Sequence, residues 1–300
     1  MLHTMKSNKN KPPRVLIYGS EGCGKSTFGA KSESPIFISQ EGGADQLEVD
    51  ELQGINSWDT LKKGLNDLII QPHDFKTLVI DSADWVEKLA HQHIIGTSGK
   101  DIVRANGGYG AGYRDSERMH KELIDQISQV REKRNMAIIV TAHAHVKPVK
   151  DPSMMQDYDS FEIKCHELVS SLWREWVDAL LFVRFRTFVK ESESTKARAL
   201  SDGSRVMYTR KQPSFQAKNR YGLPEEMDFT LNSWNEFISF ARSGQESINT
   251  IVKDIVGMMS LITDETLLKK VNESVANEKT VEGMIKIRTR LEQITNQKGV

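Results

Sequence analysis

The chain has 300 residues, of which 27% are charged and 38% are hydrophobic, and its 41 Lys and Arg residues balance its 41 Asp and Glu residues. This length suits one large domain with an appendage. The zero net charge excludes a nucleic-acid-binding surface built from overall basicity, so any such surface must come from local clusters of cations. Two cysteines are too few for a disulfide framework, which favours a reducing compartment.

Residues 1–13 are polar and basic without an apolar core, which is not the pattern of a secretory signal peptide. Elsewhere, no stretch approaches the ~20 apolar residues of a membrane-spanning helix. We therefore expect a cytoplasmic protein with no membrane partner.

The first motif along the chain is a phosphate-binding loop. Residues 19–26 read Gly-Ser-Glu-Gly-Cys-Gly-Lys-Ser and match the P-loop pattern Gly-x-x-x-x-Gly-Lys-Ser/Thr at every position. The apolar run 14–18 predicts a buried strand before the loop, and residues 26–31 begin a helix after it. The amides of the loop and of the helix N-terminus would then point at one spot and hold phosphate oxygens. The predicted nucleotide-binding residues are Gly19, Ser20, Glu21, Gly22, Cys23, Gly24, Lys25, Ser26 and Thr27.

Three residues of this loop have individual roles. Lys25 would reach the outer phosphates and the Ser26 hydroxyl would hold Mg²⁺, so the predicted cofactors are ATP and Mg²⁺. Cys23 has two interpretations, a thiol that places nucleotide binding under redox control or simply a small residue that fits the loop.

Strands and helices alternate after the loop, which predicts an α/β fold with a mostly parallel central sheet flanked by helices. The run 77–81 is apolar without alternation, as expected for a strand buried on both faces. The predicted elements are strands at 35–39, 77–81 and 136–141, helices at 58–70, 83–95 and 116–134, and a flexible loop with four glycines at 106–113.

The pattern changes in the second half of the chain. Residues 143–162 are polar and read as a long loop, of the kind that is functional or disordered in compact domains. A helix at 165–176 and strands at 179–189, 205–211 and 214–219 follow, and we expect the last two strands to form a hairpin around Pro213. Apolar stripes at helical spacing from residue 247 onward predict a helical appendage. The predicted organisation is a flexible N-terminus at 1–12, a core at 13–243 and the appendage at 244–300.

Two acidic positions can serve ATP hydrolysis. A P-loop enzyme needs a second acidic residue near Mg²⁺ at the end of a buried strand, and Asp81 ends such a strand. The alternative for Asp81 is a cap on the helix that follows. The attacking water needs a base, for which Glu41, after the strand at 35–39, can face the γ-phosphate across the sheet edge. Glu87, on the helix after Asp81, is the rival candidate.

This order of motifs resembles the RecA-like ATPase core. It consists of a P-loop, a Glu after the next strand, a strand-terminal Asp and a later strand that ends in a polar residue. The chain looks most like the bacteriophage ATPases of that group, which are recombinase cores that promote single-strand annealing. The resemblance covers roughly residues 12–240 and implies a RecA-like P-loop NTPase in the cytoplasm of a bacterial host. The further matching stretches are 109–113, 141–143, 151–152 with 158–159, 173–179 and 218–224.

The resemblance also assigns roles to three later residues. Lys218 and Arg220 match the Lys-x-Arg that reaches the ATP of a neighbouring subunit in RecA-like hexameric helicases, which implies a homo-oligomer, ring or filament. A cation inserted there stabilises charge on the transferring phosphoryl group. His143 sits where this fold places a γ-phosphate sensor. The alternatives are surface cations, a structural imidazole, or a metal site that includes His143, His145, Cys165 and His166, whose spacing matches no common site.

Single-stranded DNA is the partner that the resemblance implies. Residues 184–220 hold ten Lys and Arg against three acids. In RecA-like assemblies the loops after the strands that here end at Asp81 and Thr141 line the central axis. Both loops carry cations, and the first carries tyrosines that can stack on bases. The alternative is that the tyrosines pack locally and the cations are solvated. The candidate DNA-binding residues are Arg104, Tyr109, Tyr113, Arg114, Lys147 and Lys150.

The preferred function is an ATP-dependent, single-stranded-DNA-binding recombination protein that promotes annealing or strand exchange. The alternatives are a replication accessory ATPase (helicase-like or helicase-loading) and a nucleotide-gated binding module. A small-molecule kinase is disfavoured because no compact Arg-rich lid is evident. The helical appendage lies outside the resemblance and could dock a single-strand binding protein, mediate oligomerisation or cover a sheet edge.

Overall fold

The structure is a computed structural model that describes residues 11–40, 45–98, 101–150, 156–190, 198–200, 203–243, 248–260, 262, 264–278 and 281–297. Residues Lys11–Glu236 form one compact unit, and a second unit begins at Phe237. The division falls inside α6 (Ser233–Ser243), ahead of the boundary at 243–244 that we expect from the sequence. Each unit is described separately below.

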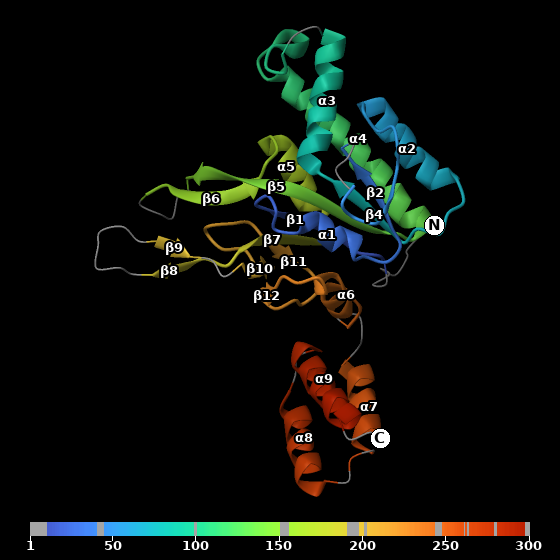
Figure 1. The fold of residues 1–300 in the computed structure, drawn as a ribbon, viewed down its shortest axis with the longest axis vertical. Helices are drawn as coiled ribbons and strands as arrows, with labels where there is room; N and C mark the ends of the chain where they lie inside the picture. Colours follow the sequence, from blue (N-terminus) through green and yellow to red (C-terminus); the bar gives the residue numbers. More distant parts are fainter. Residues whose placement is uncertain are drawn as a thin grey trace, which may run out of the picture. The chain divides into compact units, whose positions relative to one another are not determined.

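A mostly parallel sheet runs through the first unit (Figure 1). Its strand order is β12-β10-β7-β1-β5-β4-β2-β3, in which the six strands from β7 to β3 are parallel to their neighbours. β5 therefore separates the P-loop strand β1 from β4, the strand that ends at Asp81. The strands are β1 (Arg14–Gly19), β2 (Pro35–Ser39), β3 (Asp50–Glu51), β4 (Thr77–Asp81), β5 (Ala137–Val149), β7 (Ala179–Phe185), β10 (Arg205–Tyr208) and β12 (Glu226–Asp228).

Helices cover both faces of this sheet, which explains why its central strands are apolar without alternation. One face packs on a continuous apolar cluster that also contains residues of α2 (Trp58–Ile70), α3 (Ala83–Ser98), α4 (Ala111–Arg134) and α5 (Glu167–Trp176). On the other face, Gly29 of α1 (Lys25–Ala30) lies against Val79 and Phe37. The predicted α/β architecture, a mostly parallel central sheet flanked by helices, is confirmed.

The predicted long loop at 143–162 is wrong. β5 continues through this region to Val149 and pairs antiparallel with β6 (Tyr158–Ile163), from Ala144 opposite Ile163 to Val149 opposite Tyr158. The hairpin extends beyond the covered part of the sheet, so residues 146–148 are exposed and can be polar. A polar strand of this kind lacks the apolar pattern by which strands are identified.

The predicted hairpin around Pro213 is also wrong. β10 pairs with β7 and β12, and β11 (Lys218–Asn219) pairs with β7 as well. β10 and β11 thus pair with different parts of β7 and not with each other. At the turn between them, a single bridge joins Gln212 to Phe215. β8 (Phe188–Lys190) and β9 (Arg198–Leu200) form a separate two-stranded sheet, and η1 (Ala105–Gly107) precedes α4.

The second unit contains the helices α7 (Ile248–Met259), α8 (Glu265–Asn277) and α9 (Val281–Gln297). The apolar faces of these helices form a separate core that contains Ile251, Ile255, Val271, Met284 and Leu291. The Asp264 carboxylate begins α8 by accepting hydrogen bonds from the amides of Thr266 and Leu267. In the parts of the chain that the structure covers, no helix is long and apolar enough to cross a membrane.

Candidate nucleotide-binding site

The P-loop connects β1 to α1 in the shape that its glycines permit. Gly22 and Gly24 have φ of 71° and 97°, in the left-handed region that favours glycine. Gly19 packs so closely on β7 that a Cβ there would collide with the carbonyl oxygen of Val183. The motif glycines are therefore required by backbone geometry as well as by room for phosphates.

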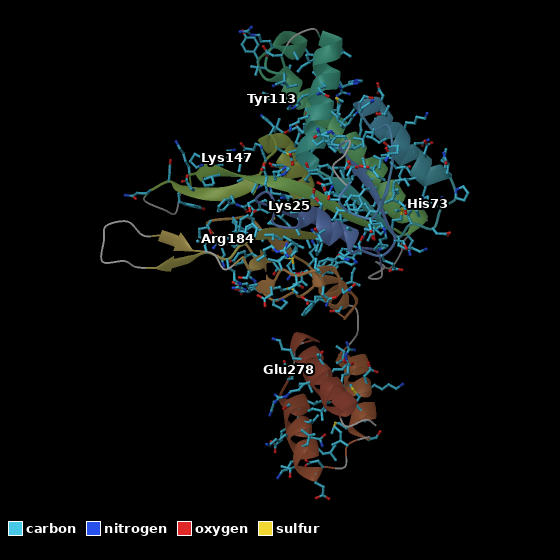
Figure 2. All side chains as sticks on the ribbon, viewed as in Figure 1. Lys25, His73, Tyr113, Lys147, Arg184 and Glu278 are labelled. Atoms are coloured by element: carbon cyan, nitrogen blue, oxygen red, sulfur yellow. The ribbon has the colours of Figure 1, made fainter. Side chains whose placement is uncertain are left out.

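Lys25 is buried at the start of α1, where the helix meets the sheet (Figure 2). Its ammonium donates hydrogen bonds to the carbonyl oxygens of Gly19 at 3.2 Å and Ser20 at 2.8 Å. The ammonium is thus held inside the loop by neutral acceptors, which phosphate oxygens can replace with stronger charge-assisted bonds. These residues fit a nucleoside triphosphate.

Asp81 lies at the carboxyl end of β4, where the sequence predicts a magnesium ligand. The Thr141 hydroxyl on the adjacent β5 donates a 2.6 Å hydrogen bond to its Oδ1. Thr141 is itself fully buried and lies in register with Ile17 of the P-loop strand. Carboxylate and hydroxyl oxygens suit Mg²⁺, so Asp81 and Ser26 would hold the ion, which supplies positive charge to the β- and γ-phosphates.

His143 lies beside the P-loop, because it pairs in register with Gly19. Its backbone N–H donates to Asp84 Oδ1 at 3.1 Å and its Nδ1 lies 3.0 Å from Asp84 Oδ2. Burial raises the pKa of Asp84, but hydrogen bonds from His143 and Ser82 outweigh burial and hold that pKa at about 2. The ionised Asp84 carboxylate therefore orients the His143 imidazole through Nδ1.

The metal alternative for this region finds no support. Among the residues that the structure describes, no three His, Cys, Asp or Glu side chains are arranged to hold a metal ion. Cys165 is buried and its pKa is raised by burial, which disfavours the thiolate that metals bind.

The candidate bases for the attacking water are Glu41 and Glu87. Glu41 lies outside the described residues. Glu87 is buried in α3, and its carboxylate accepts the backbone N–H of His166 at 2.9 Å. Burial raises the pKa of Glu87 to about 7, with a contribution from nearby Asp84 and against the His166 hydrogen bond. Glu87 thus accepts a hydrogen bond from His166, the residue that caps the N-terminus of α5.

Lys218 and Arg220 are held at the edge of the sheet opposite the P-loop. The Lys218 ammonium donates to the carbonyl oxygens of Arg174, Glu175 and Val177 at the end of α5. Arg220, whose side chain is 54% exposed, pairs with Asp178 at 3.2 Å.

Asp178 is shared by two further guanidinium groups, those of Arg14 at 2.7 Å and Arg131 at 3.7 Å. Arg14 begins β1 and Gly19 ends it, so this cluster lies about 17 Å from the P-loop of the same chain.

The candidate DNA-binding residues are divided between exposed and packed positions. Tyr109 is 98% exposed at the turn before α4, and Arg114 donates a hydrogen bond to its carbonyl oxygen at 3.1 Å. Tyr113 instead stacks on the His166 ring, with 4.0 Å between ring centroids. Three exposed cations complete the set. Arg104 pairs with Asp101, Lys147 pairs with Glu167, and Lys150 follows β5.

A polar cavity of about 480 Å³ lies between the β5–β6 hairpin and the start of α5. Lys147 and Lys150 line it together with His166 and Arg174. Two of the predicted DNA-binding cations therefore face one hollow of the hairpin, whereas Tyr109 and Arg104 belong to the loop before α4.

Two residues of this site escape prediction from the sequence. Asp84 lies three residues past Asp81, a spacing that could have indicated a place at the same end of the sheet, and its carboxylate is the partner of His143. Arg205 donates from Nη1 to the Cys23 carbonyl oxygen of the P-loop at 3.2 Å. The sequence places Arg205 only within a cationic segment, because no local pattern links residues 182 positions apart.

The model of a family described as an AAA domain matches residues 11–221. No curated protein matches the sequence. Among solved structures, the crystal structure of the RadB recombinase is similar over 73% of this chain and 87% of its own, with 12% identity and a TM-score of 0.39. Because the family model covers more than two thirds of the 300 residues, the chain belongs to the AAA domain family of P-loop ATPases.

Proposed function

We propose that the protein hydrolyses ATP at subunit interfaces and uses the cycle to bind single-stranded DNA and promote annealing or strand exchange. The observation that carries this proposal is the course of β5. That strand bears Thr141 and His143 beside the P-loop and then continues into the hairpin that bears Lys147. Residues beside the nucleotide-binding loop and a cation of the proposed DNA surface thus lie on the same strand.

The hydrolysis step is assigned to residues of the site. Lys25 would bind the outer phosphates, and Ser26 and Asp81 would hold Mg²⁺. Glu41 activates the water that attacks the γ-phosphorus, while the bond to the leaving ADP oxygen breaks. Asp84 holds the His143 ring beside the P-loop, where His143 would sense the γ-phosphate.

The position of Arg220 supports the proposal of an oligomer. The residue lies too far along the sheet to serve its own P-loop, and its side chain is half exposed. We propose that Arg220, with Lys218 at its side, acts on the ATP of a neighbouring subunit in a ring or filament. From the resemblance to bacteriophage ATPases we further propose that the protein acts in the cytoplasm of a bacterial host, where the C-terminal helices would dock a single-strand binding protein.

The DNA contacts are assigned to two surfaces. Tyr109 offers an exposed ring for base stacking beside Arg104 and Arg114. Lys147 and Lys150 offer cations for the phosphate backbone on the β5–β6 hairpin. Tyr113 stacks on His166 and would hold the first turn of α4 in place beside the first of these surfaces.

Hydrolysis of ATP with and without single-stranded DNA tests the proposal, with Lys25→Ala as the control. We expect turnover that DNA stimulates and that Lys25→Ala abolishes, together with a shift of a labelled oligonucleotide at low salt. DNA-independent turnover without any shift would contradict the DNA assignment. Complementary oligonucleotides then separate annealing from the alternative of a replication motor, which would unwind a duplex instead. Binding without turnover would favour a nucleotide-gated binding module.

A further inference from the structure

Arg205, the first residue of β10, lies directly against the P-loop. Its Nη1 donates a 3.2 Å hydrogen bond to the carbonyl oxygen of Cys23. A Cβ at the next residue, Gly24, would collide with the same nitrogen. The guanidinium therefore fills the space that the second motif glycine leaves open.

The guanidinium is fixed by its own neighbours. Its carbon lies 5.7 Å from the ring centroid of Phe229, a cation–π distance. The backbone of Arg205 also accepts the Phe229 N–H at 2.9 Å, and the Phe229 ring lies 5.9 Å from that of Phe28 in α1. One aromatic ring thus links Arg205 to the helix that follows the loop.

The chemistry of the loop explains why such a partner is needed. A P-loop binds phosphate through amides that point inward, so some of its carbonyl groups must point outward. An outward carbonyl in a half-buried place loses stability unless a donor satisfies it. Arg205 donates to the Cys23 carbonyl and holds the peptide that joins Cys23 to Gly24.

We propose that Arg205 is a positioning residue, which keeps the P-loop in its phosphate-binding shape through the Cys23 carbonyl and does not act on the transferred phosphoryl group. The inference rests on the proposed nucleotide binding. The proposal predicts an equal loss of affinity for ADP and ATP, because a loop that loses its shape binds the phosphates of both nucleotides less tightly. Turnover at saturating ATP should change little.

The test compares Arg205→Met, which removes the donor, with Arg205→Lys, which keeps a donor and the charge. The probe is ADP that carries a fluorescent label on its ribose, and ATP is measured by competition against it. We expect Arg205→Met to weaken both nucleotides about tenfold or more and Arg205→Lys to stay within about threefold of the native chain. Arg210→Met is the matched control, since Arg210 follows β10 in the sequence, is exposed and pairs with Glu225.

Three results would overturn the proposal. These are unchanged ADP binding in Arg205→Met, a loss confined to ATP, or a fall in kcat with ADP affinity unchanged. If Arg205→Met shows no cooperative melting transition, Arg205→Lys decides alone, and loss of ADP binding in that folded variant contradicts the proposal. A native chain that binds ADP no better than Lys25→Ala would instead contradict the proposed function.

Discussion

The Thr141 hydroxyl donates a 2.6 Å hydrogen bond to the Asp81 carboxylate, across the boundary between β5 and β4. The bond fixes one carboxylate oxygen and leaves the remaining lone pairs for a metal ion. Because Thr141 is fully buried, this orientation does not depend on solvent. The orientation of Asp81, which we propose as a magnesium ligand, therefore depends on the neighbouring strand.

Thr141→Val should raise the Mg²⁺ concentration that half-maximal ATP hydrolysis requires, because an unrestrained Asp81 must be ordered when the ion binds. Titration of hydrolysis with Mg²⁺ measures this. Thr77→Val is the matched control, since Thr77 is buried at the other end of β4 and its hydroxyl donates to the Glu33 carbonyl oxygen at 2.9 Å. Each variant should lose about 1 kcal/mol of stability, but an equal Mg²⁺ requirement in both would contradict the role of Thr141.

Glu87 should make the stability of the fold depend on pH. A carboxyl whose pKa is raised on folding stabilises the fold fully below its ordinary value of 4.5 and loses that contribution as pH rises through about 7. The free energy of unfolding by urea should therefore fall as the pH rises from about 4.5 to about 7, the ordinary and the raised pKa values of Glu87. In Glu87→Gln, which stays neutral and can still accept the His166 N–H, this fall should be smaller.

The comparison for Glu87 is Glu122→Gln, on the exposed surface of α4, where the side chain is 53% exposed. This variant should keep the pH dependence of the native chain. An identical pH dependence in Glu87→Gln and the native chain would show that the buried carboxyl does not titrate in this range.

Tyr109 and Tyr113 should respond differently to substitution although they stand four residues apart. Tyr109→Ala should weaken oligonucleotide binding roughly five- to hundredfold, the range for one stacked base, and leave the melting temperature unchanged. Tyr113→Ala should lower the melting temperature, because its ring stacks on His166. Fluorescence anisotropy with a labelled oligonucleotide and thermal melting measure the two effects. Unaltered DNA binding in Tyr109→Ala would remove this residue from the interface.

Arg220→Ala should abolish turnover and preserve ATP binding, because the residue is proposed to act in a neighbouring subunit. Mixing Arg220→Ala with Lys25→Ala gives interfaces that combine an intact P-loop with an intact Arg220, so hydrolysis should reappear in the mixture. The measurement is phosphate release from each variant and from an equimolar mixture. If the mixture stays as inactive as its components, Arg220 does not act in trans.

The local motifs of this protein are predictable from its sequence, and its long-range contacts are not. The P-loop depends on eight adjacent residues, and Asp81 is identified by the apolar run before it, so both are evident from residue order. The parallel sheet follows from alternating strands and helices. By contrast, Arg205 reaches the loop from 182 residues away, through two antiparallel strand pairings that no periodicity encodes.

The polar hairpin of β5 and β6 illustrates a second limit. Strands are identified by apolar side chains on a covered face, and beyond Ala142 β5 leaves the buried part of the sheet. Its backbone is held by pairing with β6, which composition does not reveal. Lys218 shows the same limit, because its three carbonyl acceptors lie at the end of a helix more than forty residues earlier.

Asp178 accepts from Arg14 and Arg220 and lies in ion-pair range of Arg131. Burial raises the pKa of this carboxyl, and the hydrogen bonds and charge of Arg14 lower it further than burial raises it. Arg14 alone contacts both of its oxygens. Arg220 can therefore swing away toward another molecule while the carboxylate stays neutralised by partners that remain, so its departure leaves no unpaired buried charge behind.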